Sequence, residues 1–182
     1  LVDFYKRLKE LEETFDKPHL LGCIITEGGT APNIVPDRAT LKATVRALDT
    51  DYLEDVMLPQ IKELAAEVAK DHHTPVETEH YEPLYKNMIN NAALNVYFIE
   101  AFNALHEEFG VYEEEDAEGS TDVGNVSHVT RAAQPEIAIG YHINAHTPEF
   151  ATAANSDFAY IQALTGAKAM VAVAVEVLFE KR

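Results

Sequence analysis

Two polar residues in the first third of the chain have the chemistry of a carboxylate clamp. Asn33 lies in the Gly- and Pro-rich segment Gly28–Pro36, whose backbone amides can cradle an anion. Arg46 lies in the alternating segment that follows, on its polar side with Lys42 and Thr44, so the guanidinium can take a carboxylate in a two-pronged pair. The alternative is structural: Asn33 caps a turn, and Arg46 is a solvated strand residue or pairs with one of the chain's many acids.

A second polar group, Gly119-Ser120-Thr121-Asp122, follows the acidic run Glu113–Asp116. Ser120, Thr121 and Asp122 offer hydroxyls, main-chain amides and a carboxylate to a substrate or to the shell around a metal. The alternative is an Asp- and Ser-rich turn that starts a helix. The acidic run itself is typical of a solvated loop.

His146 is the third candidate for a functional side chain. It precedes Thr147 and Pro148, which are typical of a helix N-cap and first helical position, so a loop would present the imidazole to a cleft. A lone histidine is more often structural than a ligand. Motifs for a nucleophilic serine or cysteine, for a phosphate-binding loop and for a His-Glu-x-x-His zinc helix are absent, so serine or cysteine catalysis and nucleotide binding are poorly supported.

The elements that must position these residues alternate between helical and strand patterns. The spacing predicts a helix over residues 1–16, strands over 19–27 and 39–47, a helix after Asp49 and a strand over 76–82. An irregular connection joins the first two strands, and Pro59 is expected to kink the second helix or mark its start. This order is the split βαβ pattern, β-α-β-β-α-β, without its opening strand. We therefore expect a chain truncated at its N-terminus.

The second half predicts an α/β layer. Its pattern indicates a helix over 91–109, a strand over 135–140, a loop that contains His142 and His146, and a closing helix over 157–180. Pro83–Asn87 separates the two patterns. We therefore predict two domains, residues 1–84 and 85–182.

Composition limits the classes of partner. The 182 residues carry 14 Lys plus Arg and 31 Asp plus Glu, a net charge of −17 that would repel nucleic acid and anionic membranes. The single Cys23 cannot form an intramolecular disulfide, and the longest apolar run, Ala169–Val175, is far shorter than the ~20 residues of a membrane span. No signal peptide is visible, and the chain begins with Leu1. We expect a soluble, cytoplasmic protein.

Taken in order, three blocks resemble the M-twenty peptidase family of zinc amidohydrolases, and the resemblance runs over nearly the whole chain. The branches it resembles most are the aminobenzoyl-glutamate hydrolases and the aminoacylase-like dipeptidases. The blocks are Gly28–Asp37 through Val45–Ala47, Gly119–Ser127, and His146–Phe150 with Ala153–Ala154. Members have an α/β catalytic domain with two zinc ions and a ferredoxin-like lid domain through which subunits dimerise.

The resemblance implies a role for each matched residue. Residues 1–84 would be the lid and 85–182 the C-terminal part of the catalytic domain. Asn33 and Arg46 match the residues that grip the substrate's free carboxylate, in one subunit or across the dimer, and His146 matches the last metal ligand. The loop with Ser120, Thr121 and Asp122 would lie on the substrate side of the metals. The implied activity is hydrolysis of an amide bond to an amino acid with a free carboxylate, with two zinc ions, or manganese or cobalt, as cofactors.

The departures from the family pattern are as informative. The His-x-Asp ligand motif, the Glu-Glu pair that holds the general base and the lid histidine lie N-terminal to the matched blocks in the family and are not found in this sequence. The Glu-Glu pairs present, such as Glu12-Glu13 and Glu107-Glu108, fall on predicted helical surfaces. We therefore expect no catalytic residue in these 182 residues, an inactive chain and weak zinc binding. The alternative function is a non-catalytic module for dimerisation or small-ligand binding.

Overall fold

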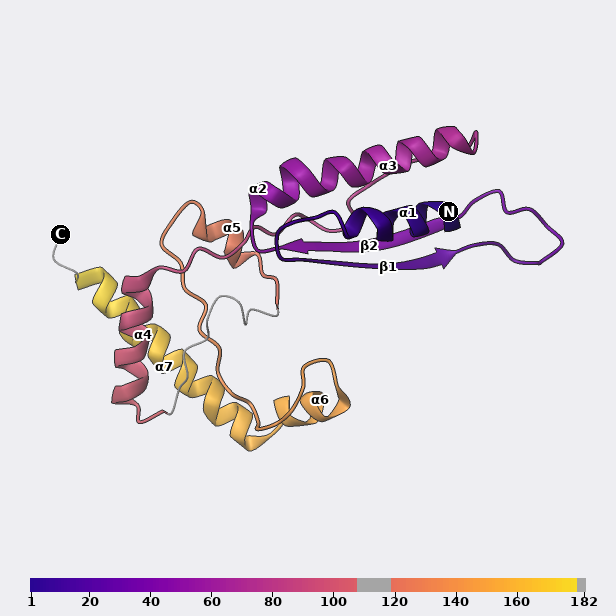
Figure 1. Ribbon diagram of the computed structural model, residues 1–182. Coiled ribbons are helices and arrows are strands. Elements are labelled where there is room, and N and C mark those ends of the chain that lie inside the picture. The colour runs from indigo at the N-terminus through magenta and orange to yellow at the C-terminus, as the bar shows by residue number, and fades with distance from the viewer. Residues whose placement is uncertain (108–118, 180–182) are drawn as a thin grey trace. The chain divides into compact units, whose positions relative to one another are not determined.

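The computed structural model describes residues 1–107 and 119–179 and divides into two compact units, Leu1–Asn87 and Met88–Arg182 (Figure 1). The division falls three residues after the predicted end of the first domain at residue 84. The acidic run Glu113–Asp116 and Glu108 lie outside the described residues. The predicted helix ends at 109 and 180 lie outside them too.

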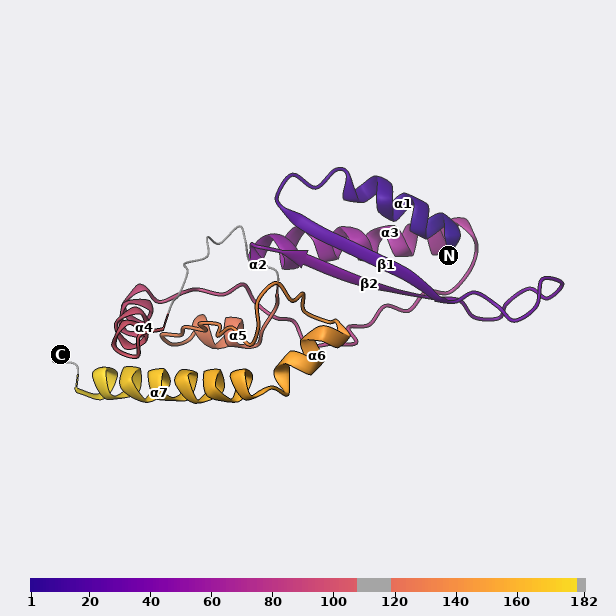
Figure 2. The same cartoon turned by 90° about the horizontal axis from the view of Figure 1, so that it is seen from below.

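The first unit is a two-stranded antiparallel sheet with helices on one face (Figures 1 and 2). Its elements are α1 (Val2–Glu12), β1 (His19–Glu27), β2 (Thr40–Ala47), α2 (Thr50–Tyr52), η1 (Leu53–Met57) and α3 (Leu58–Asp71). Both predicted strands are confirmed to within a residue, and so is their irregular connection. The unit is thus an α+β arrangement.

The alternation of β2 determines which side chains are buried. Val45 pairs with Leu21 and points toward the helices, where Leu21 is only 3% exposed. Arg46 pairs with Leu20 on the opposite face, where both side chains are exposed. The predicted polar side of β2 is therefore confirmed, because a period of two in the sequence matches the pleat of the strand.

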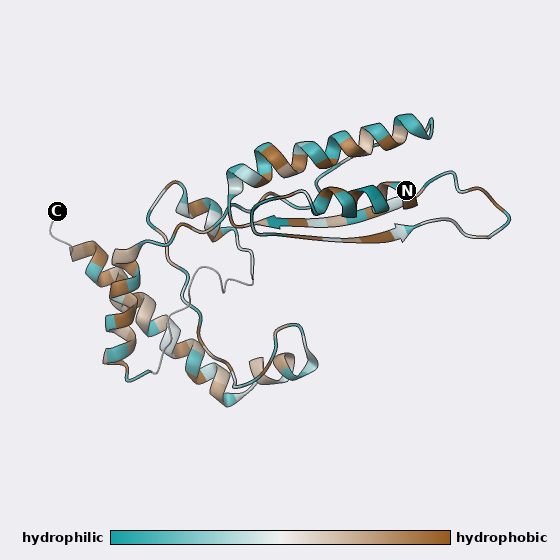
Figure 3. Ribbon diagram, in the orientation of Figure 1, coloured by the Kyte–Doolittle hydropathy of each residue, from teal (hydrophilic) through white to brown (hydrophobic). Residues whose placement is uncertain are grey.

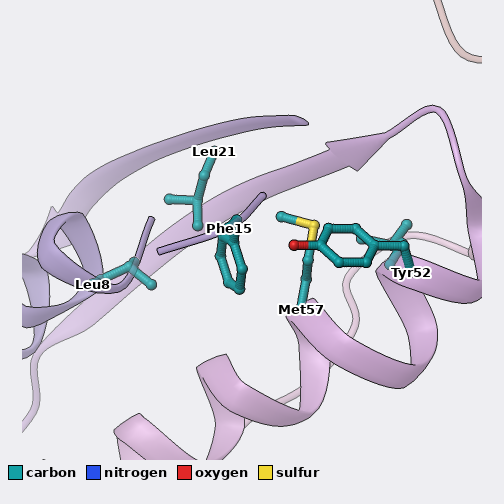
Figure 4. Close-up of a cluster of buried hydrophobic side chains, with 6 residues drawn as sticks. Leu8, Phe15, Leu21, Tyr52 and Met57 are labelled. Carbon is teal, nitrogen blue, oxygen red and sulfur yellow. The ribbon is translucent and has the colours of Figure 1, made fainter. Parts of the chain in front are cut away.

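The core of the first unit lies between the sheet and the helices (Figure 4). Leu8 of α1 and Met57 of η1 are completely buried and meet Leu21 of β1 in this cluster. The ring of Phe15 packs edge-on against that of Tyr52, with centroids 6.4 Å apart. This apolar contact holds α1 and the α2–η1–α3 segment to the same face of the hairpin.

Helix α1 ends at Glu12 rather than at the predicted residue 16. The Thr14 hydroxyl donates to the Leu11 carbonyl oxygen over 2.7 Å, and the Phe15 amide donates to Glu12 in a tighter turn. A threonine side chain that bonds the backbone in this way competes with helix continuation. The early end lets Phe15 enter the core.

The predicted helix after Asp49 is confirmed, with a local widening before Pro59. The Asp49 carboxylate caps it by accepting from the Tyr52 amide over 3.1 Å. A π turn, η1, then precedes α3, and Pro59 stands at the second position of α3. Proline has no amide proton to donate, so the first turn of a helix tolerates it. Pro59 thus marks the start of α3, one of the two predicted outcomes.

The predicted strand over residues 76–82 is wrong. The structure has an extended segment there without ladder bonding to β2. Alternation would place Val76, Thr78 and His80 on one side and Tyr81 on the other, so neither side is apolar enough to be buried. In the split βαβ pattern the last strand also needs the opening strand beside it, and the described residues contain no such strand.

Charged residues join the start of α1 to the end of α3. Arg7 bridges Asp3 at 3.0 Å and Asp71 at 2.8 Å, and His72 Nε2 lies 2.9 Å from Asp3. Hydrogen bonding to His72, together with the Arg7 guanidinium, lowers the pKa of the Asp3 carboxyl below its ordinary value. All these side chains keep at least 35% of their surface exposed, so the network orients the helix ends and adds little to stability.

The second unit is built from helices. They are α4 (Ala92–Ala104), α5 (Val123–Ser127), α6 (Pro148–Ala154) and α7 (Asp157–Phe179). Asn91 caps α4 through the Leu94 amide, and α4 packs on α7 through Phe102, Ala169 and Val173. Helix α4 ends before the predicted residue 109.

The predicted strand over residues 135–140 is also wrong, and no strand occurs in the described part of the second unit. Ile137 packs instead against the α4–α7 cluster, and a Cβ added at Gly166 of α7 would lie 3.5 Å from its side chain. An extended apolar segment of this kind needs a neighbouring strand before it can form a ladder. The predicted α/β layer is therefore absent from the described residues.

Helix α7 is apolar along most of its length (Figure 3). Within the described residues it is long and apolar enough to cross a membrane, judged by length and composition alone. The core helix of a soluble protein passes the same test, and Ala169 and Val173 are buried against α4. The absence of membrane contact stays a prediction.

Truncation of the helix–sheet core tests the first unit. We expect Leu8→Ala to lower the free energy of unfolding by about 2–5 kcal/mol, because it leaves a cavity where the side chain is fully buried. Leu20→Ala, at an exposed position on the open face, should cost less than about 0.5 kcal/mol. The free energy of unfolding of both variants can be measured by urea denaturation, with amide exchange of residues 1–87 as the readout for the first unit. An equal loss of unfolding free energy in the two variants would contradict the burial of Leu8 in the core.

Candidate functional site

Arg46 lies in three cross-strand rows on the helix-free face of the sheet, which we call the open face. The pairs are Leu20 with Arg46, Gly22 with Thr44, and Ile24 with Lys42. Lys42, Thr44 and Arg46 are all exposed, and no helix of this unit covers them. Arg46 is thus an exposed cation on the face of the sheet that points away from the helices.

Tyr81 borders these rows from the extended segment after α3. Its hydroxyl donates to the Ala43 carbonyl oxygen over 3.4 Å and lies 3.4 Å from the Thr44 hydroxyl. The Lys42 ammonium sits 5.3 Å from the centre of the Tyr81 ring, within the range of a cation–π contact. Sequence reasoning missed this residue, because Tyr81 was assigned to a strand and its approach to β2 depends on the path of the chain.

Asn33 lies in the loop between β1 and β2, where its side chain is exposed. Gly29 adopts a φ of 114°, and a Cβ there would lie 2.6 Å from Pro36 Cγ. Only glycine allows the two arms of the loop to come this close. The loop tip is also apolar and open to solvent, with Val35 91% exposed.

Within one chain the hairpin keeps Asn33 and Arg46 apart. The loop leaves the hairpin at Glu27 and Thr40, whereas Arg46 pairs with Leu20 at the other end. Six residues of strand separate Thr40 from Arg46, which corresponds to about 20 Å. Figure 1 shows the loop extending away from the α2 end of the strands. The structure therefore does not bring the two halves of the predicted clamp together.

His146 ends a loop just before α6. The Thr147 hydroxyl caps this helix by accepting from the Phe150 amide over 3.2 Å, and Pro148 is its first residue, as predicted. His146 is exposed with a φ of 62°, a conformation uncommon for a residue with a side chain. The loop is held by Tyr141, whose ring lies 5.8 Å from that of Phe158 in α7.

The segment with Ser120, Thr121 and Asp122 leads into α5. The Thr121 hydroxyl accepts from the Val123 amide over 3.3 Å, and Asp122 occupies the N-cap position without capping through its side chain. Ser120 and Asp122 are exposed. The segment is thus a turn that starts a helix, as in the structural alternative. A role beside a substrate stays a prediction.

The described residues do not form a complete metal site. In residues 1–107 and 119–179, no three His, Cys, Asp or Glu side chains are grouped so that they could hold a metal ion. A zinc site needs three or four protein ligands. His146 can therefore supply one ligand, and the remaining ligands would have to come from outside the described residues.

Comparison with known proteins shows what this chain is similar to. Residues 1–73 match the family model described as "Peptidase dimerisation domain", of the M-twenty peptidases. Most of the first unit is therefore similar to a peptidase dimerisation domain.

The chain is related to the M-twenty peptidases, and the resemblance that its motifs predict is confirmed. It is 32% identical to the mouse Xaa-Arg dipeptidase over 183 aligned positions, which cover 97% of this chain and 41% of that protein. It is 31% identical to the human Xaa-Arg dipeptidase over 160 positions, covering 86% and 36%. The chain thus spans about two fifths of the length of these relatives.

The close contact at Gly29 generates a test of the loop that carries Asn33. We expect Gly29→Ala to open this loop, because the added methyl group would collide with Pro36 and the backbone conformation would be strained. Gly28→Ala is the matched control, since its Cβ would meet Ile25 at an ordinary 3.7 Å. Hydrogen exchange of residues 28–39 should accelerate in Gly29→Ala alone. Equal exchange in both variants would contradict the close approach.

Proposed function

We propose that this chain is part of a metal-dependent amidohydrolase. The enzyme cleaves the amide bond to an amino acid that carries a free carboxylate, in a substrate of the N-acyl amino acid, aminobenzoyl-glutamate or dipeptide type. The observation that carries the proposal is the exposed Arg46 guanidinium on the open face of a peptidase dimerisation domain. Arginine suits this role because its planar fork of N–H donors matches a carboxylate.

Residues 1–84 would act as a lid of ferredoxin-like fold and as the dimer interface. Support comes from the two-stranded sheet, which is covered by helices on one face and whose outer edges pair with no further strand among the described residues. An opening strand from outside residues 1–182 would complete one edge, and a second copy of the chain can pair with the other. The partners are then a small-molecule substrate and a second subunit.

The separation of Asn33 from Arg46 suggests what a dimer would contribute, because a second subunit could bring the two residues to one carboxylate. Because the two residues lie at opposite ends of the hairpin, one carboxylate cannot reach both within a single chain. In a dimer, the Asn33 loop of one subunit approaches the open face of its partner. Gly29 and Pro36 keep the base of this loop narrow, which favours such insertion.

The metal would be held only partly by this chain. His146, ahead of the Thr147 cap, would supply one imidazole to a site for two zinc ions, or for manganese or cobalt. Such ions, when bound, activate water and polarise a carbonyl. The described residues hold no group of three metal ligands, and the general base would lie outside this chain.

The residues of this chain would bind and orient the substrate. Arg46 holds the carboxylate and so fixes the distance from that group to the scissile amide. Ser120, Thr121 and Asp122 would line the pocket with hydroxyls, amides and a carboxylate ahead of α5. The acyl group is left unspecified by these contacts.

The second candidate function is a non-catalytic module for dimerisation or small-ligand binding. The lack of a three-ligand metal group in the described residues favours it. The gene upstream of the Leu1 codon separates the two proposals. A His-x-Asp motif and a Glu-Glu pair after apolar strands would support the amidohydrolase, whereas a reading frame that lacks both would support the module.

Substitution of Arg46 tests the carboxylate-binding role. We expect the chain to bind N-acetyl-alanine and Arg46→Gln to weaken that binding roughly 10- to 100-fold, the effect of losing a charged two-pronged contact. N-acetyl-alaninamide, which lacks the negative charge, is the control ligand and should bind neither protein. NMR titration measures both affinities. Equal affinity of the two proteins for N-acetyl-alanine would rule out Arg46.

Zinc titration tests the division of the metal site. We expect this chain to bind zinc weakly and without fixed stoichiometry, because His146 lacks the neighbours that a stable site requires. Isothermal calorimetry of the chain and of His146→Ala should give similar heats. Tight one-to-one binding that disappears in His146→Ala would show that the chain holds a complete site.

A further inference from the structure

The segment that joins the two units is held by two buried hydroxyl groups. Thr50 in the first unit and Ser127 in the second are 5% and 8% exposed, and with Gln162 they are the buried polar residues of the described chain. Each of the two hydroxyls bonds to the joining segment. Burying a hydroxyl costs free energy unless its hydrogen bonds are made, so two such groups on one short segment indicate that the segment is fixed at two points.

Thr50 fixes the segment to the first unit. It is the first residue of α2 and directly follows the capping Asp49. Its hydroxyl donates to the Asn87 side-chain oxygen over 2.6 Å and accepts from the Asn87 amide over 2.9 Å. Both the side chain and the backbone of Asn87 are therefore held at the start of α2. The neighbouring Tyr52 lies in the core of this unit, which makes the start of α2 a firm point of attachment.

Ser127 fixes the segment to the second unit. It is the last residue of α5, and its hydroxyl accepts from the Ile89 amide over 2.9 Å and donates to the Gly124 carbonyl oxygen over 2.6 Å. Two residues further, the Asn91 amide donates to the Ala132 carbonyl oxygen over 3.1 Å, and the Asn91 side chain caps α4. From residue 89 onward the chain is thus bonded to the second unit.

Met88 lies between the two fixed residues. Met88 itself makes no hydrogen bond to any other described residue. Each residue has two soft backbone dihedrals, so about four of them lie between the bonded amides of Asn87 and Ile89. We propose that Met88 is the pivot at which the two units change direction relative to each other, and that Thr50 and Ser127 are positioning residues that confine the change to it. Relative motion of two compact units is expected where few residues connect them.

The pivot exists whatever the activity, but it has a consequence that rests on the proposed function. Arg46 lies in the first unit and His146 in the second. Rotation at Met88 therefore changes the distance between the proposed carboxylate-binding residue and the proposed metal ligand. Hinges of this kind consist of a few residues that absorb the change in backbone dihedrals. The two hydroxyls would limit how far such a change spreads along the chain.

Removal of one hydroxyl at a time tests the two fixed points in the 182-residue chain. Thr50→Val should raise the exchange rate of the Asn87 amide roughly 5- to 30-fold, the effect of leaving a buried amide unbonded. Ser127→Ala should do the same to the Ile89 amide, and each variant should leave the other amide unchanged. Thr50→Ser keeps the hydroxyl and should exchange like the native chain. Thr26→Val, which removes an exposed hydroxyl from β1, is the matched control. Hydrogen exchange followed by NMR measures these rates, and native exchange of the β1 and β2 amides verifies folding.

Glycine substitution tests the position of the pivot. Spin labels on Glu67→Cys in α3 and Glu176→Cys in α7, both exposed positions, report the distance between the units in a Cys23→Ala background. We expect Met88→Gly to broaden the distribution of that distance, because glycine removes the restriction on φ. Asn90→Gly is the control and should leave the distribution unchanged, since residues 89 and 91 are both bonded within the second unit.

Two results would overturn the inference. If Asn90→Gly broadens the distribution as much as Met88→Gly, the change of direction is not confined to Met88. If Thr50→Val and Ser127→Ala change neither amide exchange nor the distribution, the hydroxyls do not fix the segment. Both measurements are made without a ligand. Their failure would therefore leave the carboxylate-binding role of Arg46 intact, and loss of that role would leave the pivot intact.

Discussion

The packing of α1 and η1 onto one face of the β1–β2 hairpin is the constraint on which the first unit depends. Two strands alone cannot bury enough apolar surface to be stable in water, so the helices must cover one face. Leu8 and Met57 lie completely within this layer. Because successive residues of a strand point to opposite faces, burying Val45 places Arg46 on the open face. The exposure of Arg46 on the open face is therefore a consequence of the core.

Local sequence patterns were enough to predict the elements that depend only on residues near to one another in the sequence. The strands over 19–27 and 40–47 and the caps at Asp49 and Thr147 depend on residues a few positions apart. The strands predicted over 76–82 and 135–140 required a neighbouring strand far away in sequence, and the described residues supply none. Alternation of side chains indicates that a segment can be extended, whereas ladder formation depends on a partner. Single-sequence reasoning has no access to that partner.

The candidate site was predictable by residue type and only partly by arrangement. Arg46 could be placed correctly because its face follows from the period of β2. The distance between Asn33 and Arg46 depends on the length of the hairpin, which keeps the two residues apart within one chain. Tyr81 was missed because its approach to Thr44 is a tertiary contact 37 residues distant in sequence. Residue types indicate chemistry, and the connections between elements decide which residues can share a ligand.

The proposed carboxylate-binding residue and the proposed metal ligand lie in different units. In the proposed function, the first unit supplies the cation that holds a carboxylate, Arg46, which lies within residues 1–87. The second unit contributes an exposed imidazole, whose usefulness depends on ligands beyond the described residues. A binding surface needs only correctly placed charges, while a metal centre needs several ligands at bonding distance at once. Carboxylate recognition can therefore be present in this chain without metal affinity. The proposed division therefore predicts that the chain binds a carboxylate and binds zinc only weakly.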